Sequence, residues 1–237
     1  LSTKPVEPYV GVIHRLDKPV SGVMVYAKTK NAAASLSKQV AEGKMHKKYL
    51  AVLCGKPVDN VEKYVDYLLK DEKENTSRIV DMGIKGGKRA ELICRALETK
   101  PVEPYGELTL AEIELLTGRH HQIRVQMSGH GLPLWGDNRY NPAFQKGDAA
   151  MSGSAAERAA ETGGQEQMEK KKRESGRILL RERRRSGTGR SGRALRVDVA
   201  LAAYELAFTH PETGESMIFQ HNPSGGIFRQ FQMPGQQ

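Results

Sequence analysis

The sequence contains few cysteines and no long apolar run, and each absence excludes a class of protein. Only two of its 237 residues are cysteines, Cys54 and Cys94, and they lie far apart without a Cys-x-x-Cys pair. We therefore expect neither a zinc site nor a disulfide framework, and a reducing compartment is the default. No apolar stretch approaches the roughly 20 residues that a membrane-spanning helix requires, so no membrane partner is expected.

Basic residues are unevenly distributed, and their concentration in one part of the chain explains most of the net charge of +9. Residues 146–196 hold 14 Lys or Arg and 7 Asp or Glu, a local charge of +7, whereas the remainder carries only +2. Net charge alone therefore does not indicate that the remainder of the chain binds nucleic acid.

Aromatic residues are absent from 146–193, which are rich in Ala, Gly, Ser, Glu and Arg. Because so little apolar surface cannot offset the entropy of ordering, we expect a disordered insertion there, with some helix around 165–185. It could be a basic arm that binds an RNA backbone or a solvated spacer. The flanking segments, 1–145 and 194–237, are expected to form one domain.

The remaining residues mix strand and helix patterns without a regular βαβ rhythm, which favours an α+β fold. A helix is expected over 31–42, capped near Thr29 or Asn31 and stopped by Gly43, and a shorter helix over 120–127. The lone tryptophan, Trp135, is expected in the core. The predicted strands are 23–27, 47–53, several short strands within 61–97, 108–116, an alternating stretch from 195 to 210, and 216–220.

Three polar segments carry side chains suited to chemistry: the loop His14–Asp17, the strand entry Lys47–Tyr49, and the helix start Thr117–Val125. A carboxylate beside cationic groups on a loop suits a carboxylate that acts as a reagent. Each segment alone also has an ordinary structural interpretation. Asp17 could open a turn, Tyr49 could be a half-buried strand tyrosine, and Arg124 could form a surface ion pair.

Taken together, these segments make the chain resemble the RluA-type RNA pseudouridine synthases. The motifs keep the family's order over residues 10–145 and 197–220, and five motifs in order are a far more specific signal than any one of them. The matching text is His14-Arg15-Leu16-Asp17-Lys18 with Ser21-Gly22, Lys48-Tyr49, Gly118-Arg119-x-His121-Gln122-Ile123-Arg124-Val125, Gly131-x-Pro133-x-x-Gly136-Asp137-x-x-Tyr140, and Phe208-Thr209-His210-Pro211-x-Thr213-Gly214.

The resemblance implies an α+β fold with a mixed, largely antiparallel central sheet, flanking helices and a catalytic cleft. It also implies isomerisation of uridine to pseudouridine in structured RNA. The C1′–N1 bond breaks, the uracil turns, and C1′ rejoins at C5. Because this rearrangement involves no redox change and no external group, no cofactor is expected.

The resemblance also assigns roles to individual residues. Asp17 matches the catalytic aspartate, which attacks C1′ or takes a ribose proton in a glycal route. Arg124 matches the arginine that pairs with it, and we expect its guanidinium fork to grip both carboxylate oxygens. Tyr49 matches the aromatic that packs against the flipped-out base, and Arg15 the residue that fills the vacated position. His14, Arg119 and His121 could contact RNA phosphates.

Some features depart from the family or stay open. The family's opening strand has no matching pattern in the 13 residues before His14, so we expect that strand to be missing. His120, His121 and His130 lack the spacing and acidic partner of a metal site, so no metal is expected. The partner is expected to be ribosomal, transfer or messenger RNA, the protein a monomer, and the compartment intracellular: cytoplasm, mitochondrion or plastid.

Two other functions compete with the enzyme. The first is a catalytically inactive RNA-binding protein or RNA chaperone that retains the fold, and turnover by the purified chain would separate the two. The second is a two-carboxylate sugar hydrolase, which is disfavoured because no second acid accompanies Asp17 in a matching motif.

Overall fold

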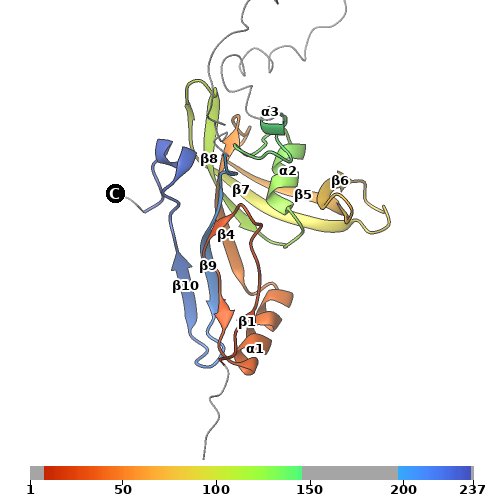
Figure 1. The fold of residues 1–237 in the computed structure, drawn as a ribbon, viewed down its shortest axis with the longest axis vertical. Helices are drawn as coiled ribbons and strands as arrows, with labels where there is room; N and C mark the ends of the chain where they lie inside the picture. Colours follow the sequence, from red (N-terminus) through yellow and green to blue (C-terminus); the bar gives the residue numbers. More distant parts are fainter. Residues whose placement is uncertain (1–7, 146–196, 236–237) are drawn as a thin grey trace, which may run out of the picture.

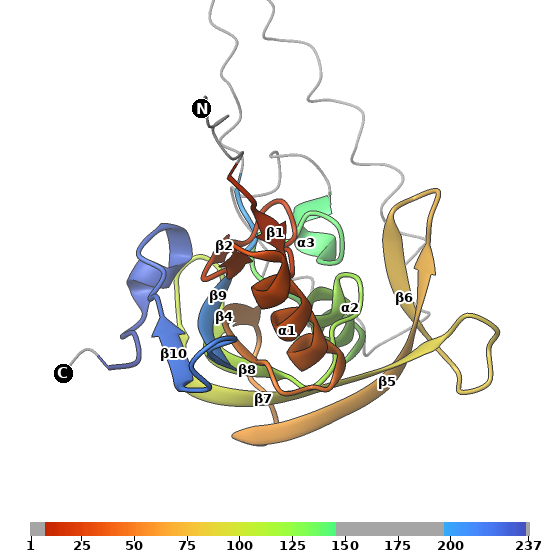
Figure 2. The ribbon, with the colours of Figure 1, turned by 90° about the horizontal axis from the view of Figure 1, so that it is seen from below.

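The structure, a computed structural model, describes residues 8–145 and 197–235 (Figure 1). The predicted insertion at 146–193 lies outside these residues. A single curved sheet organises the rest of the molecule. Figure 2 shows that this sheet bends around the helices α1 (Lys30–Ala41) and α2 (Gln122–Gly129), which lie on the same side of it.

The sheet is mixed and largely antiparallel, as expected. Its strands follow the order β10-β9-β4-β8-β7-β5-β6, and β2 adds a parallel pairing to β9. A separate pair, β1 with β3, lies beside α1 (Figure 1). The strands are β1 (Gly11–Val12), β2 (Ser21–Gly22), β3 (Tyr26–Ala27), β4 (His46–Cys54), β5 (Val61–Asp71), β6 (Thr76–Val80), β7 (Lys88–Pro101), β8 (Glu107–Leu115), β9 (Leu201–Thr209) and β10 (Ser216–Gln220). Two short helices, α3 (Pro142–Gln145) and the 3₁₀ helix η2 (Gly226–Gln230), complete the described part.

Strand β4 runs through the centre of the core because its apolar residues cover both of its faces. Leu50 and Val52 pack into one apolar cluster, which also contains Trp135, so the prediction of a core tryptophan is confirmed. Ala51 and Leu53 pack into a second cluster on the opposite face. This alternation follows from the two-residue period of a strand. It makes β4 a rigid support for the polar residues at its beginning.

Helix α1 forms as the sequence predicted. The Thr29 hydroxyl accepts a hydrogen bond from the Ala32 backbone N–H (3.1 Å), and Gly43 follows the helix with a φ of 69°. Gln39 fastens the helix to β9, since its side-chain amide both donates to and accepts from the Thr209 backbone at 2.8 Å. The turn from α1 into β4 is therefore held in a defined position.

Several predicted strands differ in extent from those observed. Of the run at 23–27, only Tyr26–Ala27 forms a strand, β3, which pairs with β1. The strand that pairs with β9, β2, lies just before this run. The region 61–97 contains two long strands, β5 and β7, and a single short one, β6, because each long strand pairs along most of its length. Residues 197–200 precede β9 without joining it. Gly11–Val12 form a short strand where none was expected.

Candidate active site

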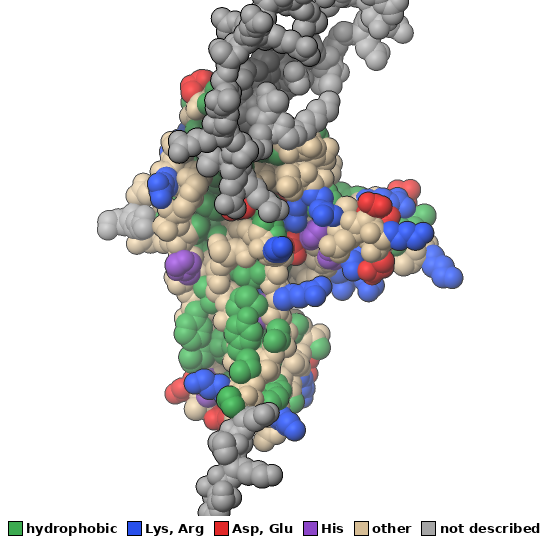
Figure 3. Space-filling view, in the orientation of Figure 1, with side chains coloured by type: hydrophobic (Ala, Val, Ile, Leu, Met, Phe, Trp, Pro, Cys, Tyr) green, Lys and Arg blue, Asp and Glu red, His purple; other side chains and the backbone are tan. Residues whose placement is uncertain are grey.

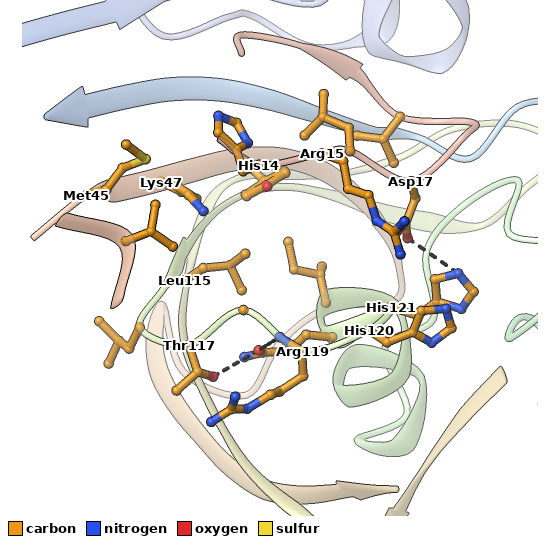
Figure 4. Close-up of a pocket in the computed structure, with 18 of the residues that line it drawn as sticks. His14, Arg15, Asp17, Met45, Lys47, Leu115, Thr117, Arg119, His120 and His121 are labelled. Atoms are coloured by element: carbon orange, nitrogen blue, oxygen red, sulfur yellow. Dashed lines mark hydrogen bonds and ion pairs between the residues drawn. The ribbon is translucent and has the colours of Figure 1, made fainter. Parts of the chain in front are cut away.

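Two cavities of about 680 and 550 Å³ meet at the loop that carries Asp17. The larger is enclosed by the start of β4, the turn after α1 and the loop before α2, and Figure 4 shows its lining. The smaller extends past Arg124 toward the Gly136 loop. Arg15, Asp17 and the pair His120–His121 border both cavities, so Asp17 lies where the two halves of one cleft join.

The residues just after Asp17 fix its loop to the sheet. The Val20 N–H donates to the Asp17 carbonyl (2.8 Å), which closes a turn. Gly22 then pairs in parallel with Ala203 of β9. Gly22 has a φ of 127°, and a Cβ there would lie 2.1 Å from the Ala203 carbonyl oxygen, so only glycine fits. The close approach of Gly22 to β9 therefore fixes how far the Asp17 loop lies from the sheet.

Arg124 reaches Asp17 with only one nitrogen, which corrects the expected two-oxygen grip. Its Nη1 lies 3.5 Å from Asp17 Oδ2. The guanidinium fork is directed at Asp137 instead, donating from Nε to Oδ2 at 2.8 Å and from Nη2 to Oδ1 at 2.7 Å. Asp137 is 1% exposed and Asp17 30% exposed. The guanidinium fork pairs with Asp137 because this buried carboxylate has no water molecules to supply hydrogen bonds in place of Arg124.

Asp137 contacts the site through Arg124, and its place in one of the family motifs did not predict this contact. Its Oδ1 also accepts the backbone N–H groups of Arg139 (2.9 Å) and Tyr140 (3.1 Å). Burial alone would raise the pKa of this carboxyl, but the Arg124 guanidinium and the two N–H groups hold it below its ordinary value. In turn, the Asp137 carboxylate offsets burial and raises the pKa of Arg124. No spacing rule links residues 13 apart in this way, so only the fold could reveal the pair.

His121 lies on the other side of Asp17. Its Nε2 is 3.7 Å from Asp17 Oδ2, and its Nδ1 is 2.7 Å from the Tyr140 hydroxyl. That hydroxyl accepts the Ser77 N–H (2.9 Å), so its own proton is available for Nδ1, and we assign the ring proton to Nε2, facing Asp17. Burial, reinforced by the Arg124 charge and opposed by the Asp17 charge, lowers the pKa of His121 to about 4. The ring is therefore neutral at neutral pH.

The other predicted site residues also border the cleft. Tyr49, on β4, lines the larger cavity together with Asp17. Burial and the Asp17 charge raise its pKa to about 12, so it stays a neutral phenol. Arg15 is exposed and lines both cavities, and Figure 4 shows it beside Asp17. The fold thus brings Asp17, Arg124, Tyr49 and Arg15 to one cleft.

His14 and Arg119 lie in the same cleft but have partners in the protein. His14 Nε2 accepts the Val25 backbone N–H at 3.3 Å, and burial together with the Lys47 charge lowers the pKa of His14 to about 4. Arg119 donates from Nε to the Arg89 carbonyl at 2.8 Å. Their suggested phosphate contacts, like that of His121, stay predictions.

In residues 8–145 and 197–235, no three His, Cys, Asp or Glu side chains are grouped so as to hold a metal ion. Cys54 and Cys94 are free thiols. Among the helices of this part of the chain, none combines the length and apolar character needed to cross a membrane.

The family model for RNA pseudouridylate synthase matches residues 2–129, more than half of the sequence. The chain belongs to this family. Its fold is also similar to that of a solved structure, Human RNA Pseudouridylate Synthase Domain Containing 1. That match has a TM-score of 0.60 and 21% identity, covering 91% of this chain and 69% of that one.

Two relatives illustrate the similarity in sequence. Ribosomal large subunit pseudouridine synthase C of Escherichia coli K12 is 30% identical over 226 residues, 95% of this chain and 56% of its own length. Ribosomal large subunit pseudouridine synthase D of Zymomonas mobilis is 33% identical over 150 residues, 63% of this chain and 45% of its own length. The chain thus spans about half the length of the curated relatives it matches.

Proposed function

We propose that this protein isomerises uridine to pseudouridine in RNA, with Asp17 as the catalytic carboxylate. The observation that carries the proposal is the position of Asp17. Its Oδ2 lies 3.5 Å from the buried Arg124 guanidinium, at the junction of two cavities, and the side chain is 30% exposed. Membership of the RNA pseudouridylate synthase family supports this assignment.

The proposed reaction requires one ionised carboxylate beside the ribose. Asp17 attacks C1′ or removes a ribose proton, and the C1′–N1 bond breaks with its electron pair moving to N1 of the uracil. The uracil turns and C5 bonds to C1′, as the Asp17–C1′ bond breaks in the first route or as Asp17 returns the ribose proton in the second. The C5 proton is then lost and N1 takes up a proton. Atoms and electrons balance without an external group. The Arg124 guanidinium, 3.5 Å from Asp17 Oδ2, limits the rotation of this carboxylate.

The remaining residues are assigned by position. Tyr49 packs against the uracil once the base leaves the RNA stack, and Arg15 occupies the place that the base left. Asp137 fixes the position of the Arg124 guanidinium, because its two oxygens accept hydrogen bonds from Nη2 and Nε at 2.7 and 2.8 Å. Phosphate contacts from His14, Arg119 and His121 stay predictions, and so does a monomeric state.

Two further parts of the proposal concern the partner and the domain. The names of the relatives refer to the large ribosomal subunit, which favours ribosomal RNA as the substrate class. We also assign residues 1–145 and 194–237 to one catalytic domain interrupted by 146–193. Strand β9, from the second segment, pairs with β4 from the first, which supports this division.

The test is Asp17→Asn, which preserves shape and removes the charge. With RNA labelled by tritium at C5 of uridine, the variant should release no tritium above background, whereas Asp81→Asn, at an exposed position, should release it as the wild type does. Undiminished release by Asp17→Asn would reject the assignment of this residue. RNA binding without release by the wild type would favour the inactive RNA-binding protein instead.

A further inference from the structure

Two adjacent lysines at the start of β4 have opposite surroundings. Lys48 lies 3.3 Å from a Glu205 oxygen and 3.8 Å from a Glu112 oxygen. Lys47 makes no ion pair or side-chain hydrogen bond within the described residues, and it lines the larger cavity together with Tyr49. Figure 4 shows Lys47 pointing into this cavity from one side while Asp17 and His121 border it from the other.

The Lys47 ammonium is partly buried without a counter-charge. Burial lowers its pKa, whereas the Glu112 and Glu205 carboxylates outweigh burial and raise the pKa of Lys48. The group beside Lys47 gives no compensation, because His14 is a neutral imidazole. A desolvated cation that has no partner in the protein is unfavourable unless a ligand supplies the missing negative charge.

The lining of the larger cavity has the charge pattern expected for an anionic ligand. Its described residues include four cationic side chains but a single carboxylate, that of Asp17. The four cations are Arg15, Lys47, Lys70 and Arg119. Figure 3 shows Lys and Arg side chains gathered over the neighbouring part of the molecule, where β5 and β6 lie.

We propose that Lys47 binds a phosphodiester group of the RNA strand next to the target uridine. The proposal rests on the proposed function and adds a residue that none of the five family motifs contains. Lys47 precedes Tyr49 by two residues, about 7 Å along the strand, so a nucleotide whose base packs on Tyr49 has its backbone near this ammonium. A lysine acts as a point charge toward phosphate, which suits a contact that must tolerate any RNA sequence.

The first test compares Lys47→Met with Lys48→Met, two variants that remove the same charge from neighbouring positions. Each is titrated with a fluorescein-labelled oligouridylate over a range of salt concentrations. Loss of one phosphate contact should reduce the slope of log affinity against log salt by about 0.7, which corresponds to about fivefold weaker binding at 0.1 M salt. We expect this change for Lys47→Met and the wild-type slope for Lys48→Met.

The second test uses the wild-type protein and so does not depend on the folding of a variant. Because its pKa is lowered, Lys47 should react faster with limiting acetic anhydride than Lys48, as read by mass spectrometry of peptides. Oligouridylate should protect Lys47 from acetylation, and a methylphosphonate oligomer of the same length, which has an uncharged backbone, should not.

The outcomes separate this proposal from alternatives. Equal salt slopes for Lys47→Met and the wild type, or acetylation of Lys47 unaffected by oligouridylate, would overturn it. Weaker binding by Lys47→Met with an unchanged slope would also overturn it, because that result indicates contact with a neutral base atom. If the wild type released no tritium but Lys47 still determined the slope, the proposed function would fail while the phosphate site stood.

Discussion

At the scale of single residues, the two carboxylates of the cleft contact Arg124 in different ways. Asp137 is buried and takes both arms of the Arg124 fork, whereas Asp17 receives one nitrogen at 3.5 Å. A reagent held by a full bidentate grip would have its oxygens occupied and its charge strongly stabilised. Asp137 therefore holds the Arg124 guanidinium in place while most of the hydrogen-bonding capacity of the Asp17 carboxylate stays unused by Arg124.

We predict that Asp137→Asn impairs both stability and turnover. The amide oxygen can still accept the N–H groups of Arg139 and Tyr140, but Arg124 loses its buried counter-charge. The free energy of unfolding should fall by about 3–5 kcal/mol, toward the lower end because Asp17 lies near enough to compensate in part. Turnover should fall on the order of 100-fold, as expected when a positioning contact is lost.

Urea unfolding and tritium release measure the two effects, with Asp81→Asn as the matched surface control. If Asp137→Asn kept wild-type turnover while its stability fell, Asp137 would serve the fold alone. The loss in turnover is therefore the readout that a purely structural role would not produce.

At the scale of elements, the two-residue strand β2 determines where the Asp17 loop lies. Its parallel pairing with β9 brings Gly22 so close to Ala203 that a Cβ would be 2.1 Å from the carbonyl oxygen. A strand this short contributes little burial of its own. Its pairing joins the Asp17 loop to the sheet that contains Tyr49.

We predict that Gly22→Ala displaces this loop. The positive φ and the overlap should lower the free energy of unfolding by about 1–3 kcal/mol. At temperatures where the variant is still fully folded, its rate of tritium release should nevertheless be lower than that of the wild type. Gly225→Ala is the control, because a Cβ at Gly225 meets nothing within 4 Å. Normal release by a folded Gly22→Ala protein would show that β2 does not position Asp17.

At the scale of the whole molecule, the cleft is built from segments far apart in sequence, and its walls contain two neutral histidines. His14 comes from the Asp17 loop and His121 from the start of α2. Burial lowers the pKa of each from 6.5 to about 4. Both histidines are buried in this way only in the assembled cleft, so unfolding restores the ordinary pKa.

We predict that the protein loses stability as pH falls from 6.5 toward 4. In this interval the unfolded chain binds protons that the folded protein excludes, so the stability is fully present above pH 6.5 and declines below it. The free energy of unfolding, measured in urea across this range, should become less dependent on pH in His14→Gln and His121→Gln. The exposed His221→Gln should keep the wild-type slope, and an unchanged slope in all three variants would contradict the prediction.

Much of the fold and the list of site residues were predictable from sequence, because they depend on local patterns. A cap near Thr29 or Asn31 and the Gly43 stop predicted α1, and the largely apolar stretch 47–53 predicted β4. Trp135 was expected in the core and lies there. The boundaries of β5 and β7 were not predictable, since a strand extends as far as its neighbour supplies hydrogen-bond partners. The same reason explains why only Tyr26–Ala27 of the run at 23–27 forms a strand.

The sequence by itself determined which side chains are available to the cleft. The motifs consist of residues that are neighbours in the chain, so they can be recognised without knowing the fold. Only the tertiary structure decided how those side chains are paired. It gave the Arg124 fork to Asp137 rather than Asp17, and it turned Lys47 into the cavity while pairing Lys48 with Glu112 and Glu205. The physical reason is burial: which charge loses its water, and so requires a partner, depends on how distant segments pack together.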